Sequence, residues 1–404
     1  MRGKSGWLPF GVALVLCFVH TVAHGEAGQF SLSGFGTLGL ARSSSDHAQF
    51  LRDLSQPEGL SGGRWSGRID SIFGVQASWQ PTAELEFVGQ AVSRLRYDGT
   101  RDPELMWAYG KWEPDARVSL RAGRLGADFM MLADSRLVGY SFLTVRPPAD
   151  FFGPLFFSHF DGADASLSVP LAAGIVRGKL FAGATQEKAI GTPGVWDTRG
   201  SPVRGAVVDY MEGAWLLRAN YAQITFADNI NFWPLITGLN GFGANAAANL
   251  LLTKDKTARF YSVGAVYDQG PLQVQMMLNR ITQESAVFQN SHAGYLLAGY
   301  RVGTVTPFAG VSWWKTKYKN HSTGLPSPAF DALNVPFRTI MAASGADQNT
   351  YTLGARLDVL TNVALKLQWD AIRGDAGSVF PFARTEAGWS GRTHVISATM
   401  DFVF

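Results

Sequence analysis

The side chains that most often perform enzyme chemistry are scarce in this chain of 404 residues. Its one cysteine, Cys17, excludes a disulfide framework and a cysteine-ligated zinc or iron–sulfur centre. There is no G-x-S-x-G motif, and no glycine-rich phosphate loop precedes a helical pattern. The later histidines are scattered without metal-ligand spacing; they are His47, His159, His292, His321 and His394. We therefore expect no enzyme activity, no metal site and no cofactor.

The charged residues have an ordered arrangement that suits the guidance of ions better than catalysis. In 68–79, 84–96 and 363–370, polar and charged residues share one parity and apolar residues share the other. This alternation predicts strands with one polar and one apolar face. Charged side chains that line a common surface select ions by their sign.

The composition differs from that of ordinary soluble domains. Charged residues make up 17% of the chain, against roughly 25% in soluble domains, and 45 glycines are more than usual. The net charge of +3 gives no reason to expect a nucleic-acid partner.

The amino terminus has the pattern of an export signal. Arg2 and Lys4 precede an apolar run over 7–19, and small residues follow it. This run is shorter than the roughly 20 residues of a membrane-spanning helix. We predict a secretory signal peptide over 1–25, with cleavage after 25 or 27.

The spacing of the turns predicts the topology. Seven short turns alternate with eight longer segments, which makes sixteen strands with both ends on the short-turn side. The short turns are near 81 and at 113–116, 170–174, 211–213, 268–271, 302–304 and 360–362. The longer segments are 42–66, 97–104, 125–158, 186–202, 227–257, 285–293, 318–348 and 375–390. The uncharged stretch 229–253 is rich in Asn and contains Pro234, so we expect a loop with one helical turn at 244–252, not a spanning helix.

We predict an all-β fold, in which 26–404 form a single transmembrane antiparallel β-barrel domain of about sixteen strands. The turns would be periplasmic, the long loops external, and the apolar face would meet lipid. A soluble sandwich or propeller would show the same alternation. The signal peptide, the asymmetry of the loops and the terminal strand 391–404, which ends on Phe404, favour the barrel. A barrel of this size is too wide for side chains to fill, so we expect a polar, aqueous lumen.

Short motifs in three places match a known family: the opening strand 30–40, the pair 108–112 and 118–124, and the carboxyl-terminal strand. In these the chain resembles the Gram-negative general porins, which are sixteen-stranded trimeric outer-membrane channels. The resemblance implies a homotrimer, recognition of Phe404 by the barrel-insertion machinery, and a third loop, 125–158, that folds inward to narrow the pore.

The resemblance also implies where the constriction lies. A ladder of wall arginines would face acids on the third loop, and the pore-lining candidates are Arg94, Arg96, Arg117, Arg121, Asp134, Arg146 and Asp150. Arg124 has the wrong parity for the lumen unless Gly123 supports a bulge. By parity ten bases and six acids line the wall, which leans toward anions, but acids of the third loop would oppose this. The sign of the selectivity therefore stays open.

These expectations describe an outer-membrane porin for passive diffusion of ions and small hydrophilic solutes. The alternatives are a substrate-specific channel for a sugar or organic acid, and an outer-membrane barrel that serves as an enzyme or adhesin. Tryptophans such as Trp79, Trp112, Trp215 and Trp369 fall near strand ends, where an interface girdle would place them. A sugar-binding row of aromatics inside the lumen is the alternative.

Overall fold

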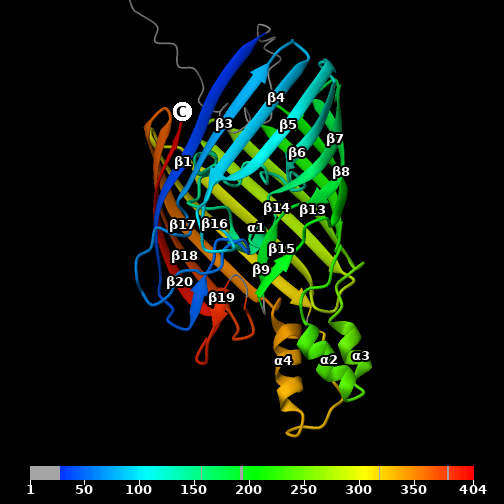
Figure 1. The fold of residues 1–404 in the computed structure, drawn as a ribbon. Coiled ribbons are helices and arrows are strands. Elements are labelled where there is room, and N and C mark those ends of the chain that lie inside the picture. Colours follow the sequence, from blue (N-terminus) through cyan, green and yellow to red (C-terminus); the bar gives the residue numbers. More distant parts are fainter. Residues whose placement is uncertain (1–27, 156, 192–193, 318, 380–381) are drawn as a thin grey trace, which may run out of the picture.

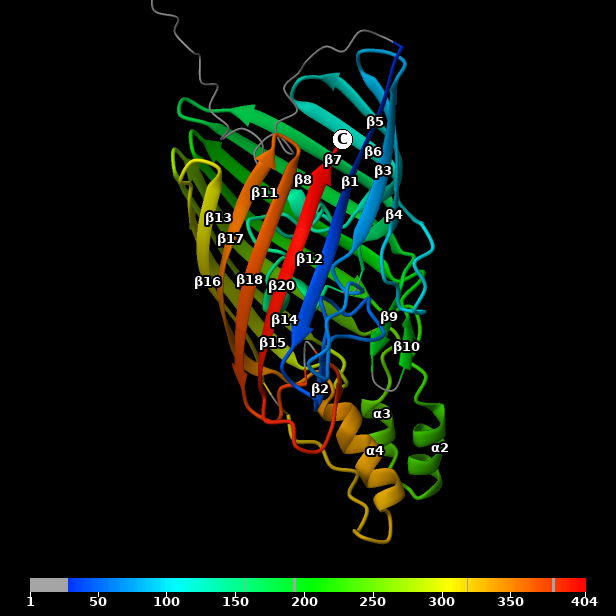
Figure 2. The same cartoon turned by 90° about the vertical axis from the view of Figure 1, so that its left-hand side faces the viewer.

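The computed structural model describes residues 28–155, 157–191, 194–317, 319–379 and 382–404. The predicted signal peptide lies outside them. Sixteen antiparallel strands close into a barrel, and β1 pairs with β20 to complete the circle, as Figure 2 shows. The barrel strands are β1 (Gln29–Ser43), β3 (Ile72–Gln80), β4 (Leu85–Ser93), β5 (Glu104–Asp115), β6 (Val118–Gly126), β7 (His159–Pro170), β8 (Ile175–Thr185), β11 (Pro202–Glu212), β12 (Trp215–Thr225), β13 (Thr257–Gln269), β14 (Leu272–Gln283), β15 (Asn290–Tyr300), β16 (Val305–Lys317), β17 (Asp347–Leu360), β18 (Val363–Gly374) and β20 (Arg392–Val403). The predicted barrel of sixteen strands is confirmed.

The alternation along the strands places apolar side chains on the outer surface of the barrel and polar side chains on its inner surface. On β18, Leu365, Leu367 and Trp369 are exposed on the outer surface, with Leu367 at 60%. Lys366, Gln368 and Asp370 point inward and are each no more than 5% exposed. The chain folds this way because a barrel in lipid satisfies all its backbone groups between strands and keeps an apolar band outside.

Short turns and long loops lie at opposite ends of the barrel (Figure 1). The seven short connections are 81–84, 116–117, 171–174, 213–214, 270–271, 301–304 and 361–362, close to the predicted positions. Gly213 and Gly270 have φ of 54° and 58°, which explains glycine in these two-residue turns. Short strands in the long loops form two small sheets: β2 (Ala48–Phe50) with β19 (Phe382–Thr385), and β9 (Lys188–Gly191) with β10 (Gly194–Asp197).

Three helices project beyond the barrel at the long-loop end (Figure 1). They are α2 (Trp233–Gly241), α3 (Asn245–Leu250) and α4 (Asp331–Ala342), and they pack around a buried apolar cluster. The predicted helical turn at 244–252 corresponds to α3, but α2 was missed. Pro234 occupies the start of α2, where a proline favours a helix. None of the described helices is long and apolar enough to cross a membrane.

Several tryptophans face outward at the short-turn end. Trp79, Trp112 and Trp215 are each about half exposed at the ends of β3, β5 and β12. Trp79 stacks on Phe87 with ring centroids 5.7 Å apart. This arrangement favours the girdle over the sugar-binding row, although Trp314 on β16 points inward and is buried.

The connection between β6 and β7 enters the barrel. We call residues 127–158 the inner segment; it contains the short helix α1 (Ala149–Phe152), which lies inside the barrel in Figure 1. Its apolar side chains pack on inward-facing wall residues, so the expectation of a polar inner face is wrong for this part of the wall. The packed wall residues include Phe181, Val207, Met277, Tyr295, Leu297 and Phe308. The inner segment occupies part of the lumen that the side chains of the wall alone would leave empty.

Candidate functional site

One end of the inner segment is held by a buried ionic network. Arg146 donates to Asp70 with N···O distances of 2.6 and 2.8 Å, and its Nη1 lies 3.3 Å from Asp370 on β18. It also donates to Ser397 on β20 at 2.6 Å. Arg146 is 2% exposed, and Thr352 and Gln368 donate further hydrogen bonds to Asp370. Two carboxylates and one guanidinium are thus sealed between the segment and the wall.

Other wall bases hold the backbone of the inner segment. Lys366 donates to the carbonyl oxygens of Gly139 and Thr144 at 2.7 and 3.0 Å. Arg356 donates to the carbonyl oxygens of Tyr140 and Phe142 at 2.6 and 3.0 Å. These bases therefore anchor a loop and do not face open water.

At its other end the inner segment meets the opposite wall. Asp128 pairs with Lys179 on β8 and with Arg218 on β12, whose Nη1 lies 2.6 Å from its carboxylate. Burial alone would raise the pKa of Asp128, but Arg218 and Lys179 outweigh it and lower the pKa below its usual range. Arg218 also pairs with Asp209 at 2.6 Å.

The two acids predicted to face the ladder have different surroundings: the charge of Arg121 acts on Asp134, whereas Asp150 contacts another wall. Burial raises the pKa of Asp134 to about 6, assisted by the nearby charge of Asp128. Oδ1 of Asp134 is buried without a hydrogen-bond partner in the described chain. Asp150 accepts hydrogen bonds from Ser312 at 2.6 Å and Gln348 at 2.5 Å, and burial raises its pKa. Asp150 therefore faces β16 and β17, so the predicted pairing of this acid with the arginine ladder is wrong.

The arginines of the predicted ladder do not form a row. Arg94 is buried and lies 3.7 Å from both Glu104 and Glu187. Arg121 points inward, but it forms a bidentate pair with Asp164. Arg117 is exposed in the turn between β5 and β6, because the strand extends further than the predicted turn at 113–116. Its assignment to the constriction is wrong.

Arg124 is on the outer face, as its parity indicates. It shares parity with the exposed Leu120 and pairs with Asp161 on the neighbouring strand at 2.7 Å. Gly123 has φ of 130°, but no register shift separates it from its partners on β7. The bulge that would turn Arg124 inward is therefore absent from this strand pair.

A group of buried ionisable residues beside Arg94 was not anticipated. Side-chain ligand atoms of Glu104, His159 and Glu187 lie within 4.8 Å of one another. Nδ1 of His159 is 2.9 Å from Glu187, and although burial opposes it, this contact and the charge of Arg94 lower the pKa of Glu187 to about 2. Arg94 lies 3.7 Å from both acids, so we interpret this group as an ion-pair network. Sequence gave no signal for it because the three residues are far apart in the chain.

Two cavities open toward the long-loop end. One has a volume of about 220 Å³ and is polar; its charged lining residues are the bases Arg94, Arg96, Lys188 and Arg199 and the acids Glu104 and Glu187. Arg96, the remaining member of the predicted ladder, thus lines this cavity. The other has a volume of about 200 Å³ and is mostly apolar. The site therefore consists of a loop fixed across the lumen, with one polar and one mostly apolar cavity beside it.

Solved structures with similar barrels come from several Gram-negative bacteria. Salmonella typhi OmpF in complex with daunomycin has a TM-score of 0.58 at 11% identity, over 94% of this chain and 98% of that one. The outer membrane channel DcaP of Acinetobacter baumannii has a TM-score of 0.56 at 12% identity, over 94% and 98%. The anion-selective porin of Comamonas acidovorans has a TM-score of 0.55 at 14% identity, over 93% and 100%.

Sequence comparison adds nothing to this similarity, since no protein-family model and no curated protein matches the chain. The porin resemblance inferred from short motifs is confirmed at the level of the fold.

Proposed function

We propose that this protein is an outer-membrane channel through which ions and small solutes diffuse passively. The observation that carries the proposal is the closed barrel whose outer surface is apolar and whose wall turns charged side chains such as Lys366 and Asp370 inward. An apolar exterior of this kind suits lipid, and a wall with inward charges suits the passage of ions. The protein would reach the outer membrane by way of its signal peptide.

The inner segment would form the constriction of this channel. It crosses the lumen from β8 and β12 to β18 and β20, and its polar contacts are buried. We therefore expect a narrow pathway and a small conductance. Arg96 and the polar cavity beside it would attract anions at the entrance, while the paired Arg121 would contribute less.

We propose a homotrimer and assembly by the barrel-insertion machinery through the terminal strand and Phe404, both on the basis of the porin resemblance. Native mass spectrometry of the detergent-extracted protein tests the trimer, and a single protomer mass would contradict it.

Planar bilayers test the channel directly. The purified protein should insert with stepwise increases of conductance, and the reversal potential in a salt gradient should give the sign of the selectivity. A heat-modifiable barrel that stays electrically silent would contradict the proposal. Arg121→Ala should shift the reversal potential if this residue borders the ion path. An unchanged potential would place Arg121 outside it.

The apolar cavity favours a second function, that of a substrate-specific channel. General diffusion of hydrophilic solutes gives no reason for an apolar cavity at the entrance.

A further inference from the structure

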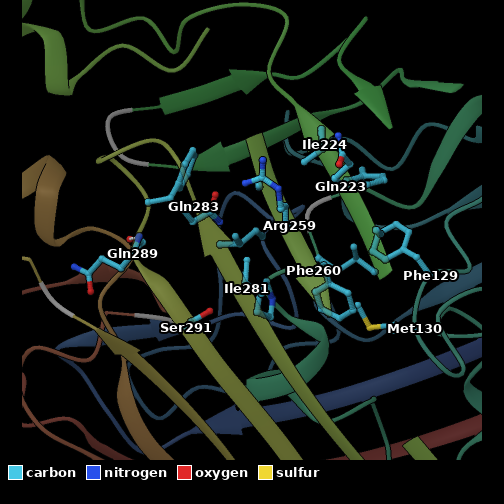
Figure 3. A pocket seen from close by; sticks show the side chains of 18 of the residues that line it. Phe129, Met130, Gln223, Ile224, Arg259, Phe260, Ile281, Gln283, Gln289 and Ser291 are labelled. Carbon is cyan, nitrogen blue, oxygen red and sulfur yellow. Dashed lines mark hydrogen bonds between the residues drawn. The ribbon is translucent and has the colours of Figure 1, made fainter. Parts of the chain in front are cut away.

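The apolar cavity lies between the inner segment, the wall and the outer loops. Phe129, Met130 and Leu155 of the inner segment form one wall, and Ile224, Phe260 and Ile281 of β12, β13 and β14 form another. Figure 3 shows Phe129, Met130 and Phe260 gathered on one side of this space. The cavity therefore borders the proposed constriction directly.

The size and the lining of this cavity suit a small ring. An apolar cavity of about 150 Å³ in another protein holds a benzene molecule and excludes water. The cavity here has a volume of about 200 Å³, which leaves room for one ring with a substituent. Transfer of an apolar ring from water into such a space is favourable because apolar surface leaves water.

The other side of the cavity is polar but uncharged. Figure 3 places Gln283, Gln289 and Ser291 together there. Nε2 of Gln289 donates to the carbonyl oxygen of Met341 at 3.1 Å, which fixes the orientation of the amide. Its Oε1 is buried and has no hydrogen-bond partner among the described residues. Gln289 thus brings an unpaired hydrogen-bond acceptor to the polar side of the lining.

An unpaired hydrogen-bond donor also lies in the lining. Nε1 of Trp196 is buried without a hydrogen-bond partner in the described chain. Unpaired buried polar groups are costly, so a ligand that pairs with them gains affinity over one that does not.

No charge is free to recognise an ionised ligand. Among the described lining residues, Arg259 alone is charged, and its guanidinium pairs with Glu284 at 2.7 Å. Arg259 also has the opposite parity to the inward-facing Ala258 and Phe260 on β13. A carboxylate that entered this cavity would lose part of its hydration without gaining a free opposite charge.

We propose that this cavity is a binding site for an uncharged solute that consists of an apolar ring and one hydroxyl or similar group. The ring would contact the aromatic and aliphatic wall, and the hydroxyl would meet Gln289 and its polar neighbours. The proposal rests on the channel function only for the path of the solute, since binding itself can be measured separately.

Fluorine NMR tests the site on the full-length protein in lipid nanodiscs, with empty nanodiscs as the background. The probe is 4-fluorophenol, compared with fluorobenzene, which lacks the hydroxyl, and with 4-fluorobenzoate, which is charged. We expect saturable binding of 4-fluorophenol, weaker binding of fluorobenzene and the weakest binding of 4-fluorobenzoate. Equal or tighter binding of the benzoate, or no saturable binding of the phenol, overturns the proposal.

Filling the cavity provides the matched variant. Ala222 on β12 lines the cavity, whereas Ala219 on the same strand is exposed on the outer face. Ala222→Phe should weaken binding of 4-fluorophenol by about tenfold or more, because the added ring occupies space that the ligand needs and a mismatch of one methylene already changes discrimination about 10–200-fold. Ala219→Phe adds the same side chain outside and should bind normally. Ala258→Phe fills the cavity from β13 if Ala222→Phe fails to give a heat-modifiable barrel.

The polar contact has its own readout. Gln289→Ala should weaken binding of 4-fluorophenol but not of fluorobenzene, which a general loss of structure would not produce. Equal weakening of both probes contradicts the assigned role of Gln289.

Single-channel recordings on the same preparation separate this proposal from the channel function. Saturable binding without conductance leaves the site standing and contradicts the channel. Conductance with no binding, or with binding unchanged in Ala222→Phe, contradicts the site and leaves the channel standing.

Discussion

The two halves of the barrel interior hold the same inner segment by different means. On the side of β18, β20 and the start of β3, Arg146 and Lys366 join the segment to Asp70, Asp370 and the wall through ion pairs and hydrogen bonds. On the side of β13 to β15, the segment packs mainly through rings and aliphatic chains, although Asp128 at the edge of this side pairs with Lys179 and Arg218. Phe151, for example, meets Tyr295 with ring centroids 5.3 Å apart.

The polar and the apolar contacts have different effects on the inner segment. Apolar packing is roughly proportional to buried area and has little directionality, so it holds the segment in the lumen without fixing its register. Buried charges tolerate few arrangements, because an unpaired buried charge is strongly unfavourable. The polar half therefore determines where the segment crosses, and the apolar half supplies much of the force that keeps it there.

Arg146→Ala should have the largest effect on the polar half. It leaves Asp70 and Asp370 buried without their cation, which costs about 3–5 kcal/mol in comparable sites. We expect the segment to detach from this wall and the single-channel conductance to rise. Single-channel recording and urea unfolding measure the two effects. Arg117→Ala, in an exposed turn, is the matched control, and equal behaviour of the two variants would contradict the proposed clamp.

Leu155→Ala tests the apolar half. Leu155 is 6% exposed, and truncation of a buried leucine to alanine costs about 2–5 kcal/mol. Stability in urea should fall, while the reversal potential in a salt gradient should not change, since no charge is removed. A shift of the reversal potential would show that the two halves do not act separately.

Asp134→Asn should have a smaller effect that depends on pH. Because folding raises the pKa of Asp134 from 3.8 to about 6, the folded protein holds this proton more tightly than the unfolded chain does. The contribution of this carboxyl to stability is therefore lost as pH rises through this range. Thermal unfolding at pH 4 to 8 should show a variant more stable than the wild type above pH 6 and equal to it at low pH. A difference independent of pH would contradict this explanation.

Arg96→Ala should have the smallest effect of the four. Arg96 is partly exposed in the polar cavity, where solvent weakens its field. Removing it should lower anion permeability slightly, with a small shift of the reversal potential that is greater at low ionic strength. A shift that does not change with salt would argue against long-range attraction by this residue.

The sequence predicted the orientation of some inward-facing residues but not the partners of others. Alternation along β18 predicted that Lys366 and Asp370 point inward, and they do. The same parity argument predicted that Arg124 lies outside the lumen. It failed for Asp150, which contacts Ser312 and Gln348, because nothing in the local pattern says which wall a long loop will meet.

The sequence by itself determined the barrel: alternating faces, seven short turns and the long connections between them follow from local periodicity and turn chemistry. Only the tertiary structure decided what occupies the lumen. The pairing of Arg146 with Asp70, 76 positions away, and the cavity between Phe129 and Phe260 depend on residues brought together when the barrel closes around the inner segment. Side-chain parity is a property of neighbouring residues, whereas the filling of an enclosed space depends on the shape of every wall around it.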